Sequence, residues 1–211
     1  MEELGIRSSD NISKYAKTIN AEYRLLRGNV FHKNLASPCQ KIYMLNEEFD
    51  EYDMVVMLDM DMFVRNGMEE DIFKDVQGIG RHTETQSRLF RSLQRKFPKL
   101  TNANFPYWGG AVYRLERKVR KNFRVHIKED EMIPFSGNYN DEGIMHRLAT
   151  LSGMEFENPY IPDNRWDCGN FEEGVEQCAM IHVRTKITPV GPKRPKIENY
   201  RNLVKRQLIT E

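Results

Sequence analysis

The most informative segment is a run of apolar residues that carries two acids, MVVMLDMDMFV, residues 54–64. Five apolar residues precede Asp59, and such a run is typical of a strand that is buried on both faces in a parallel or mixed sheet. Residues two apart in an extended strand point to the same side, so we expect Asp59 and Asp61 to converge while Met60 turns toward the core. Because two converging carboxylates repel each other, the segment predicts a site for a divalent cation with oxygen ligands.

Other interpretations of the same acids remain open. A solvated turn can carry two acids by chance, although the apolar residues before Asp59 place both acids where the chain leaves a core. A calcium loop of the Asp-x-Asp-x-Asp/Asn-Gly type would need other residues where Phe63 and Val64 stand. An aspartyl-phosphate phosphatase resembles apolar residues followed by Asp-x-Asp-x-Thr/Val and would use Asp59 as nucleophile, but Phe63 occupies the Thr/Val place.

The rest of the chain alternates helical patterns with short apolar runs. Apolar spacing predicts helices over 10–19, 38–50, 84–96, 141–151 and 197–208, with another after residue 115, and strands over 23–26, 54–64, 107–115 and 179–183. This alternation predicts the α/β class, as a single domain in which helices flank one mixed, mostly parallel sheet.

Composition limits the classes of function. The 211 residues suffice for one large domain, and 39% hydrophobic residues with a net charge of +1 indicate a folded protein without a field that would attract nucleic acid. No apolar run approaches the roughly 20 residues that span a bilayer, and the first residues lack a signal pattern. The three cysteines form no close pair of the metal-binding kind. We therefore expect a cytoplasmic protein with reduced thiols, no membrane segment and no nucleic-acid partner.

Four segments together resemble the GT-A-fold glycosyltransferases. SPCQKIYMLNEEFDEYDMVVMLDMDMFV resembles the helix and strand that carry their Asp-x-Asp motif, FPYWGGAVYRL the turn that meets the donor sugar, NYNDEGIMHRL the acidic helix start near the reacting carbon, and CAMIHVRTK the late strand with a histidine ligand. The segments occur in the family's order and the likeness extends from about residue 10 to 186. It is strongest to the retaining galactosyl- and xylosyltransferase group and to glycosyltransferase domains of large chlorella viruses.

The resemblance implies a function and a division of the chain. It implies transfer of a hexose or deoxyhexose from a UDP-sugar, bound through Mn or Mg, to a glycan or glycoprotein acceptor, a viral capsid glycan in host cytoplasm if the chain is viral. The nucleotide and metal half would span about 1–115, the acceptor half about 116–195 and a C-terminal helix about 197–208.

The resemblance also selects the third metal ligand. His182 ends the apolar run 179–183, where it is either a hydrogen-bonded structural residue or a neutral imidazole ligand beside Asp59 and Asp61, a ligand set that suits manganese. The resemblance favours the ligand. Arg184 and Lys186 are candidates to neutralise the diphosphate, or they form a solvated basic turn.

Two further groups have a functional and a structural interpretation. Trp108, Gly109 and Gly110 would let a ligand approach the backbone beside an apolar platform, or the glycines form a bulge within a strand. Asp141 and Glu142 cap a helix, or one of them, Asp141 first, accepts the acceptor's proton as general base.

Two rival functions come from other classes. An Asp-x-Asp phosphatase or phosphotransferase would release inorganic phosphate instead of a nucleoside diphosphate. A non-catalytic, metal-dependent carbohydrate-binding module would bind free glycans without turnover.

Overall fold

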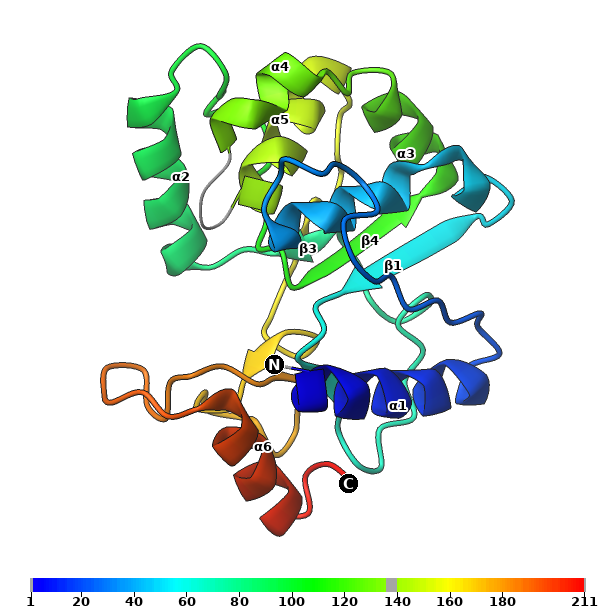
Figure 1. Cartoon of the computed structure of the whole chain (residues 1–211), viewed down its shortest axis with the longest axis vertical. Coiled ribbons are helices and arrows are strands. Elements are labelled where there is room, and N and C mark those ends of the chain that lie inside the picture. The colour runs from blue at the N-terminus through cyan, green and yellow to red at the C-terminus, as the bar shows by residue number, and fades with distance from the viewer. Residues whose placement is uncertain (1, 136–139, 211) are drawn as a thin grey trace. The chain divides into compact units, whose positions relative to one another are not determined.

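The computed structural model describes residues 2–135 and 140–210, which fall into two compact units. The first unit comprises Met1–Leu25, Leu58–Val76 and Asp163–Glu211, and the second comprises Leu26–Met57 and Gln77–Pro162. Figure 1 labels the helices α1 to α6 and the strands β1, β3 and β4. Each unit is assembled from separate stretches of chain.

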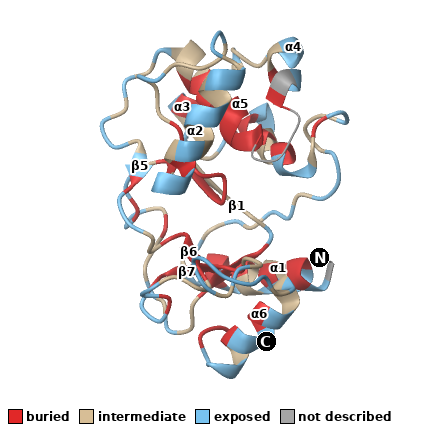
Figure 2. Cartoon of the chain, turned by 90° about the vertical axis from the view of Figure 1, so that its left-hand side faces the viewer, coloured by how far each residue is buried: buried red, intermediate tan, exposed pale blue. Residues whose placement is uncertain are grey.

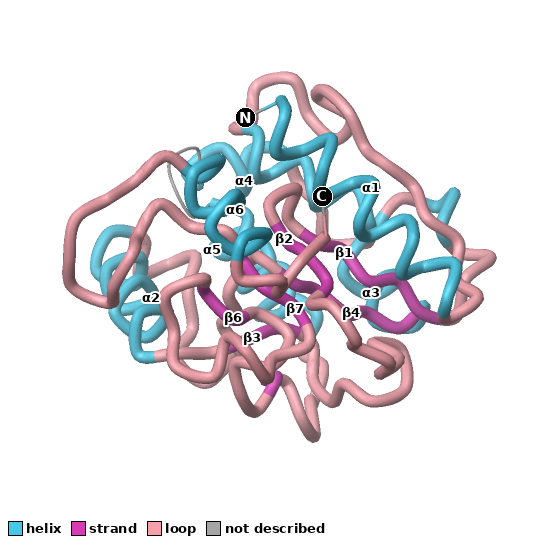
Figure 3. Tube along the Cα trace, turned by 90° about the horizontal axis from the view of Figure 1, so that it is seen from below, coloured by secondary structure: helices cyan, strands magenta, loops and turns pink. Residues whose placement is uncertain are grey.

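The first unit contains a three-stranded mixed sheet. Its elements are α1 (Glu2–Thr18), β2 (Met62–Val64), β6 (Cys168–Gly169), β7 (Met180–His182) and α6 (Lys196–Lys205). The strands lie in the order β2-β7-β6 (Figure 3). In this sheet β7 pairs antiparallel with β2, so that Met62 faces His182, and parallel with β6, so that Gly169 faces His182.

Helix α1 covers the free edge of β2 with polar side chains. Asn11 accepts a hydrogen bond from the Val64 amide at 2.6 Å and donates one to the Val64 carbonyl at 3.2 Å, while Ser8 donates to the Met62 carbonyl at 2.6 Å. The helix begins at Glu2 instead of residue 10. Its buried face includes Leu4 and Ser8. Because Ser8 is polar, the spacing of apolar residues alone does not reveal the first turns of the helix.

The remaining elements build the second unit. They are η1 (Ser37–Leu45), η2 (Glu47–Phe49), β1 (Met54–Leu58, whose last residue belongs to the first unit), β3 (Gly80–Arg81), α2 (Glu84–Lys96), β4 (Val112–Glu116), α3 (Arg117–Arg124), α4 (Glu129–Met132), η3 (Ile133–Phe135), α5 (Asn140–Ser152) and β5 (Tyr160–Ile161). Strand β1 pairs with β4, and β3 pairs parallel with β5. Most of α5 is buried (Figure 2).

The structure confirms the α/β class, with mixed sheets and flanking helices, but corrects several details. The described residues form three small sheets instead of one. The segment 54–64 forms two strands instead of one, because the chain turns at 59–61 between β1 and β2. Strand β1 is only half-buried, whereas β2 is buried. Residues 23–26 are not a strand, and the strand expected over 107–115 is limited to β4.

The structure also bears on the expectations about membrane segments and cysteines. Within 2–135 and 140–210, no helix combines the length and the apolar character needed to cross a bilayer. Cys39, Cys168 and Cys178 are buried and none of them forms a disulfide bond.

We expect that Asn11→Ala lowers the free energy of unfolding by about 2 kcal/mol, because the buried Val64 amide and carbonyl lose their partner. Urea denaturation measures the change, with Asn202→Ala on the exposed face of α6 as the control. Equal, small effects of both substitutions would show that the edge of β2 does not depend on α1.

Candidate metal centre

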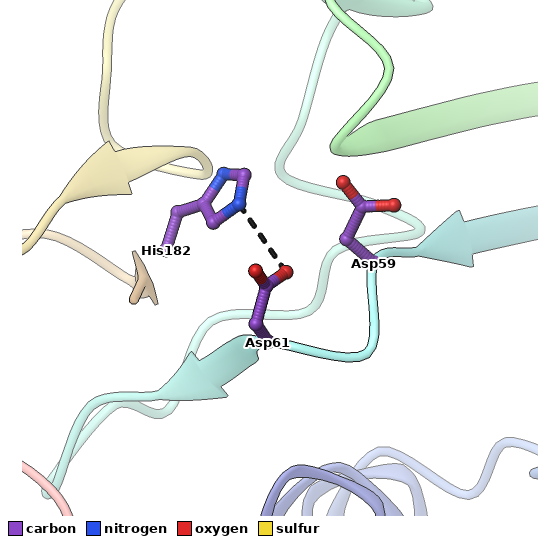
Figure 4. Close-up of side chains that lie close together, drawn as sticks. All are labelled: Asp59, Asp61 and His182. Carbon is purple, nitrogen blue, oxygen red and sulfur yellow. Dashed lines mark ion pairs between the residues drawn. The ribbon is translucent and has the colours of Figure 1, made fainter. Parts of the chain in front are cut away.

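Asp59, Asp61 and His182 come together in the first unit (Figure 4). Each of the three side chains offers one ligand atom, and these atoms all lie within 4.8 Å of one another. Asp61 and His182 are buried and Asp59 is half-buried. The prediction that these three residues share one place is therefore confirmed by their geometry.

The convergence has a different cause from the one expected. The chain turns after β1, and the Met62 amide donates to the Asp59 carbonyl at 3.1 Å to close the turn. The Asp61 carbonyl then accepts a hydrogen bond from Val183 at 2.9 Å, which continues the pairing of β2 with β7. Met60 does not face the core, since 49% of it is exposed. The turn at 59–61 and the pairing of β2 with β7 place the two acids beside His182. The alternation of side chains along a single strand does not.

His182 lies between two carboxylates. Its Nδ1 is 2.9 Å from Asp167 Oδ1 and its Nε2 is 3.2 Å from Asp61 Oδ1. Burial alone would lower the pKa of His182, but hydrogen bonds with Asp167 and Asp61 and the charges of both carboxylates outweigh burial and raise this pKa to about 9.

Asp61 has a second cationic partner, because Lys196 Nζ donates to Asp61 Oδ2. Burial would raise the pKa of Asp61, but the hydrogen bond and charge of His182, together with Lys196, lower it below its usual range. Asp61 is only 4% exposed. The alternative of a solvated turn therefore does not describe this residue.

These residues form a donor set suited to a divalent cation. If Nδ1–H donates to Asp167, the lone pair of a neutral His182 is on Nε2, the atom that faces Asp61. Two carboxylates and one imidazole suit Mn²⁺ and similar ions, and Asp167 adds the outer carboxylate that fixes the ring of such a ligand. The residues therefore fit the cation that the sequence predicts.

The two basic candidates differ in placement. Arg184 Nη2 lies 3.4 Å from Asp167 Oδ1, beside the centre. Lys186 is exposed, with Nζ 5.6 Å from the centre of the Phe171 ring. Asp167 and Lys196 were not predicted at the centre. Asp167 lies in an irregular loop with no periodic pattern, and Lys196 contacts Asp61 across 135 positions, so neither contact has a local signal in the sequence.

Asp141 and Glu142 lie in the second unit, in the first turn of α5, and both are buried. Lys41 Nζ is 2.7 Å from Asp141 Oδ2. Glu142 accepts hydrogen bonds from the Gly110 amide and the Tyr107 hydroxyl, each at 3.0 Å. Burial, followed by the charge of Asp141, raises the pKa of Glu142 to about 7. Both acids thus belong to a buried polar cluster, which is more than helix capping requires.

Trp108, Gly109 and Gly110 precede β4 and pack against protein. Trp108 is fully buried in the core and its Nε1 donates to the Pro159 carbonyl, so it offers no exposed platform for a sugar. A Cβ at Gly109 would collide with Gln86, and a Cβ at Gly110 with Asp141. These glycines permit close approach by the chain's own side chains, and neither lies in a strand bulge.

Comparisons with known proteins give little further information. No protein-family model matches the chain, and no curated protein matches it. Among solved structures, apo mouse xyloside xylosyltransferase 1 is similar with a TM-score of 0.38 and 13% sequence identity, over 89% of this chain and 75% of that one. A TM-score this low assigns neither a fold family nor an activity.

We expect that Asp167→Asn weakens Mn²⁺ binding about 10- to 100-fold, because an amide no longer fixes the His182 ring by charge. Isothermal titration with MnCl₂ measures the affinity. Asp163→Asn is the matched control, since Asp163 is exposed and lies four residues away. Unchanged affinity in Asp167→Asn would contradict the assigned role of this carboxylate.

Glu142 gives a second prediction, for stability against pH. A carboxyl group whose pKa is raised on folding, here from 4.5 to about 7, stabilises the protein fully below pH 4.5 and loses that contribution as pH rises through 7. Glu142→Gln should therefore gain stability over wild type across this window, on the order of 3 kcal/mol. Urea denaturation between pH 4.5 and 8 measures the difference. Glu157→Gln, at an exposed position of the same unit, is the control. A difference between Glu142→Gln and wild type that does not change with pH would contradict the raised pKa.

Proposed function

We propose that this chain is a divalent-metal-dependent glycosyltransferase of the GT-A type, with a nucleotide-diphosphate sugar as donor. The observation that supports it is the convergence of Asp59, Asp61 and His182 at one turn, with Asp167 behind the histidine. A metal centre of this kind could also serve other reactions, such as phosphoryl transfer. We favour glycosyl transfer because four sequence segments resemble GT-A enzymes and occur in the same order.

In this proposal the first unit binds the diphosphate. Asp59, Asp61 and His182 hold Mn²⁺ or Mg²⁺, which when bound supplies a Lewis acid for the departing nucleotide. Arg184 is the favoured diphosphate partner because it lies beside Asp167 and because, in the described part of the chain, its buried Nε has no hydrogen-bond partner. Lys186 is the exposed alternative. An anionic oxygen would satisfy the Arg184 donor as charge develops on the leaving group.

The proposed base is Asp141 or Glu142. A general base works best when its pKa is near the working pH, and burial brings the pKa of Glu142 to about 7. Asp141 is held by Lys41 at 2.7 Å. Glu142 is therefore the better candidate on its electrostatics, whereas the sequence favoured Asp141.

The substrates rest on the resemblance alone. We propose a UDP-sugar donor that carries a hexose or deoxyhexose and a glycan or glycoprotein acceptor. The likeness to chlorella virus domains adds the proposals of a capsid glycan as acceptor and the host cytoplasm as location.

Donor turnover tests the proposal. With a panel of UDP-sugars, we expect release of UDP only with Mn²⁺ or Mg²⁺, and at least about 100-fold slower release by Asp61→Asn, which loses a ligand charge. Asp163→Asn should behave as wild type. Release of inorganic phosphate would instead identify a phosphatase, and glycan binding without turnover would identify a binding module.

A further inference from the structure

Lys196 contacts the carboxylate of Asp61, which is also one of the three side chains that would bind a divalent cation. Lys196 Nζ donates to Asp61 Oδ2, while Asp61 Oδ1 faces His182 Nε2 at 3.2 Å. Both oxygens of this carboxylate therefore have cationic neighbours. A divalent ion bound to Asp61 would lie within a few ångströms of the ammonium group, where like charges repel strongly because the side chain of Asp61 is only 6% exposed.

We propose that Lys196 is a resident counter-cation of the metal centre, which neutralises Asp61 when no divalent ion is bound and is displaced when one binds. The inference rests on the metal site of the proposed function and adds to it an internal competitor that sets the cation affinity.

The helix that carries Lys196 is anchored, so displacement is confined to the side chain. Asn199 is buried and donates to the carbonyls of Arg184 at 2.7 Å and Lys186 at 3.3 Å. Tyr200 and Leu203 pack in the core of the first unit. Lys196 is the first residue of α6, and its side chain is 26% exposed. A flexible lysine stem therefore gives the ammonium group a route to water without moving the helix.

Competition predicts that loss of the Lys196 charge has two opposite effects. Without a divalent ion, the protein is destabilised because buried Asp61 loses a partner. Cation binding is strengthened, because the ion no longer displaces an ammonium group. A lysine with a structural role alone would give the first effect without the second.

The test is calorimetric titration of Mn²⁺ into the full chain after removal of metal with EDTA. We expect Lys196→Met to bind Mn²⁺ about tenfold tighter than wild type and to melt at a lower temperature in EDTA. Lys196→Arg, which keeps the charge, should stay within about threefold of wild type. Lys193→Met removes an equal charge at an exposed position three residues away and should also match wild type. If Lys196→Met does not fold, Lys196→Gln provides the same comparison.

Two results would overturn the inference and are distinguishable. If wild type binds Mn²⁺ but the neutral Lys196 variants bind it equally or more weakly, Lys196 is not a competitor, and the proposed function stands. If wild type binds no Mn²⁺ at millimolar concentration, the metal centre and this inference fail together.

Discussion

The contacts of His182 with Asp61 and Asp167 are the interaction on which the centre depends. They join the turn after β1, which is distant in the sequence, to the loop before β6 and the end of β7. Because burial of charge is unfavourable unless it is compensated, the arrangement needs cations near its carboxylates, and Lys196 and Arg184 supply them.

Asp61 in the first unit and Glu142 in the second are both buried, but their pKa values shift in opposite directions. In the first unit, His182 and Lys196 outweigh the cost of burial and lower the pKa of Asp61, so this carboxylate stays ionised. In the second, burial and neighbouring Asp141 raise the pKa of Glu142 to about 7, so it can exchange a proton near neutral pH. These environments suit a cation ligand and a proton acceptor respectively, the two roles that the proposed reaction requires.

Local signals were sufficient for part of this account. Apolar spacing predicts the bounds of α2, which Thr83 caps, and the apolar runs around Asp59, Asp61 and His182 single these three residues out. Features decided by distant contacts were missed. The pairing of β2 with β7 breaks the strand expected over 54–64, the packing of Trp108 removes it from solvent, and Lys196 reaches Asp61 across 135 positions. No local pattern encodes such contacts.

Anomalous diffraction from crystals grown with MnCl₂ tests the metal centre directly. We predict one strong manganese peak bonded to Asp59, Asp61 and His182 Nε2, with His182 Nδ1 still on Asp167 and the Lys196 ammonium group moved off Asp61. Manganese bound elsewhere, with Lys196 still paired to Asp61, would contradict it.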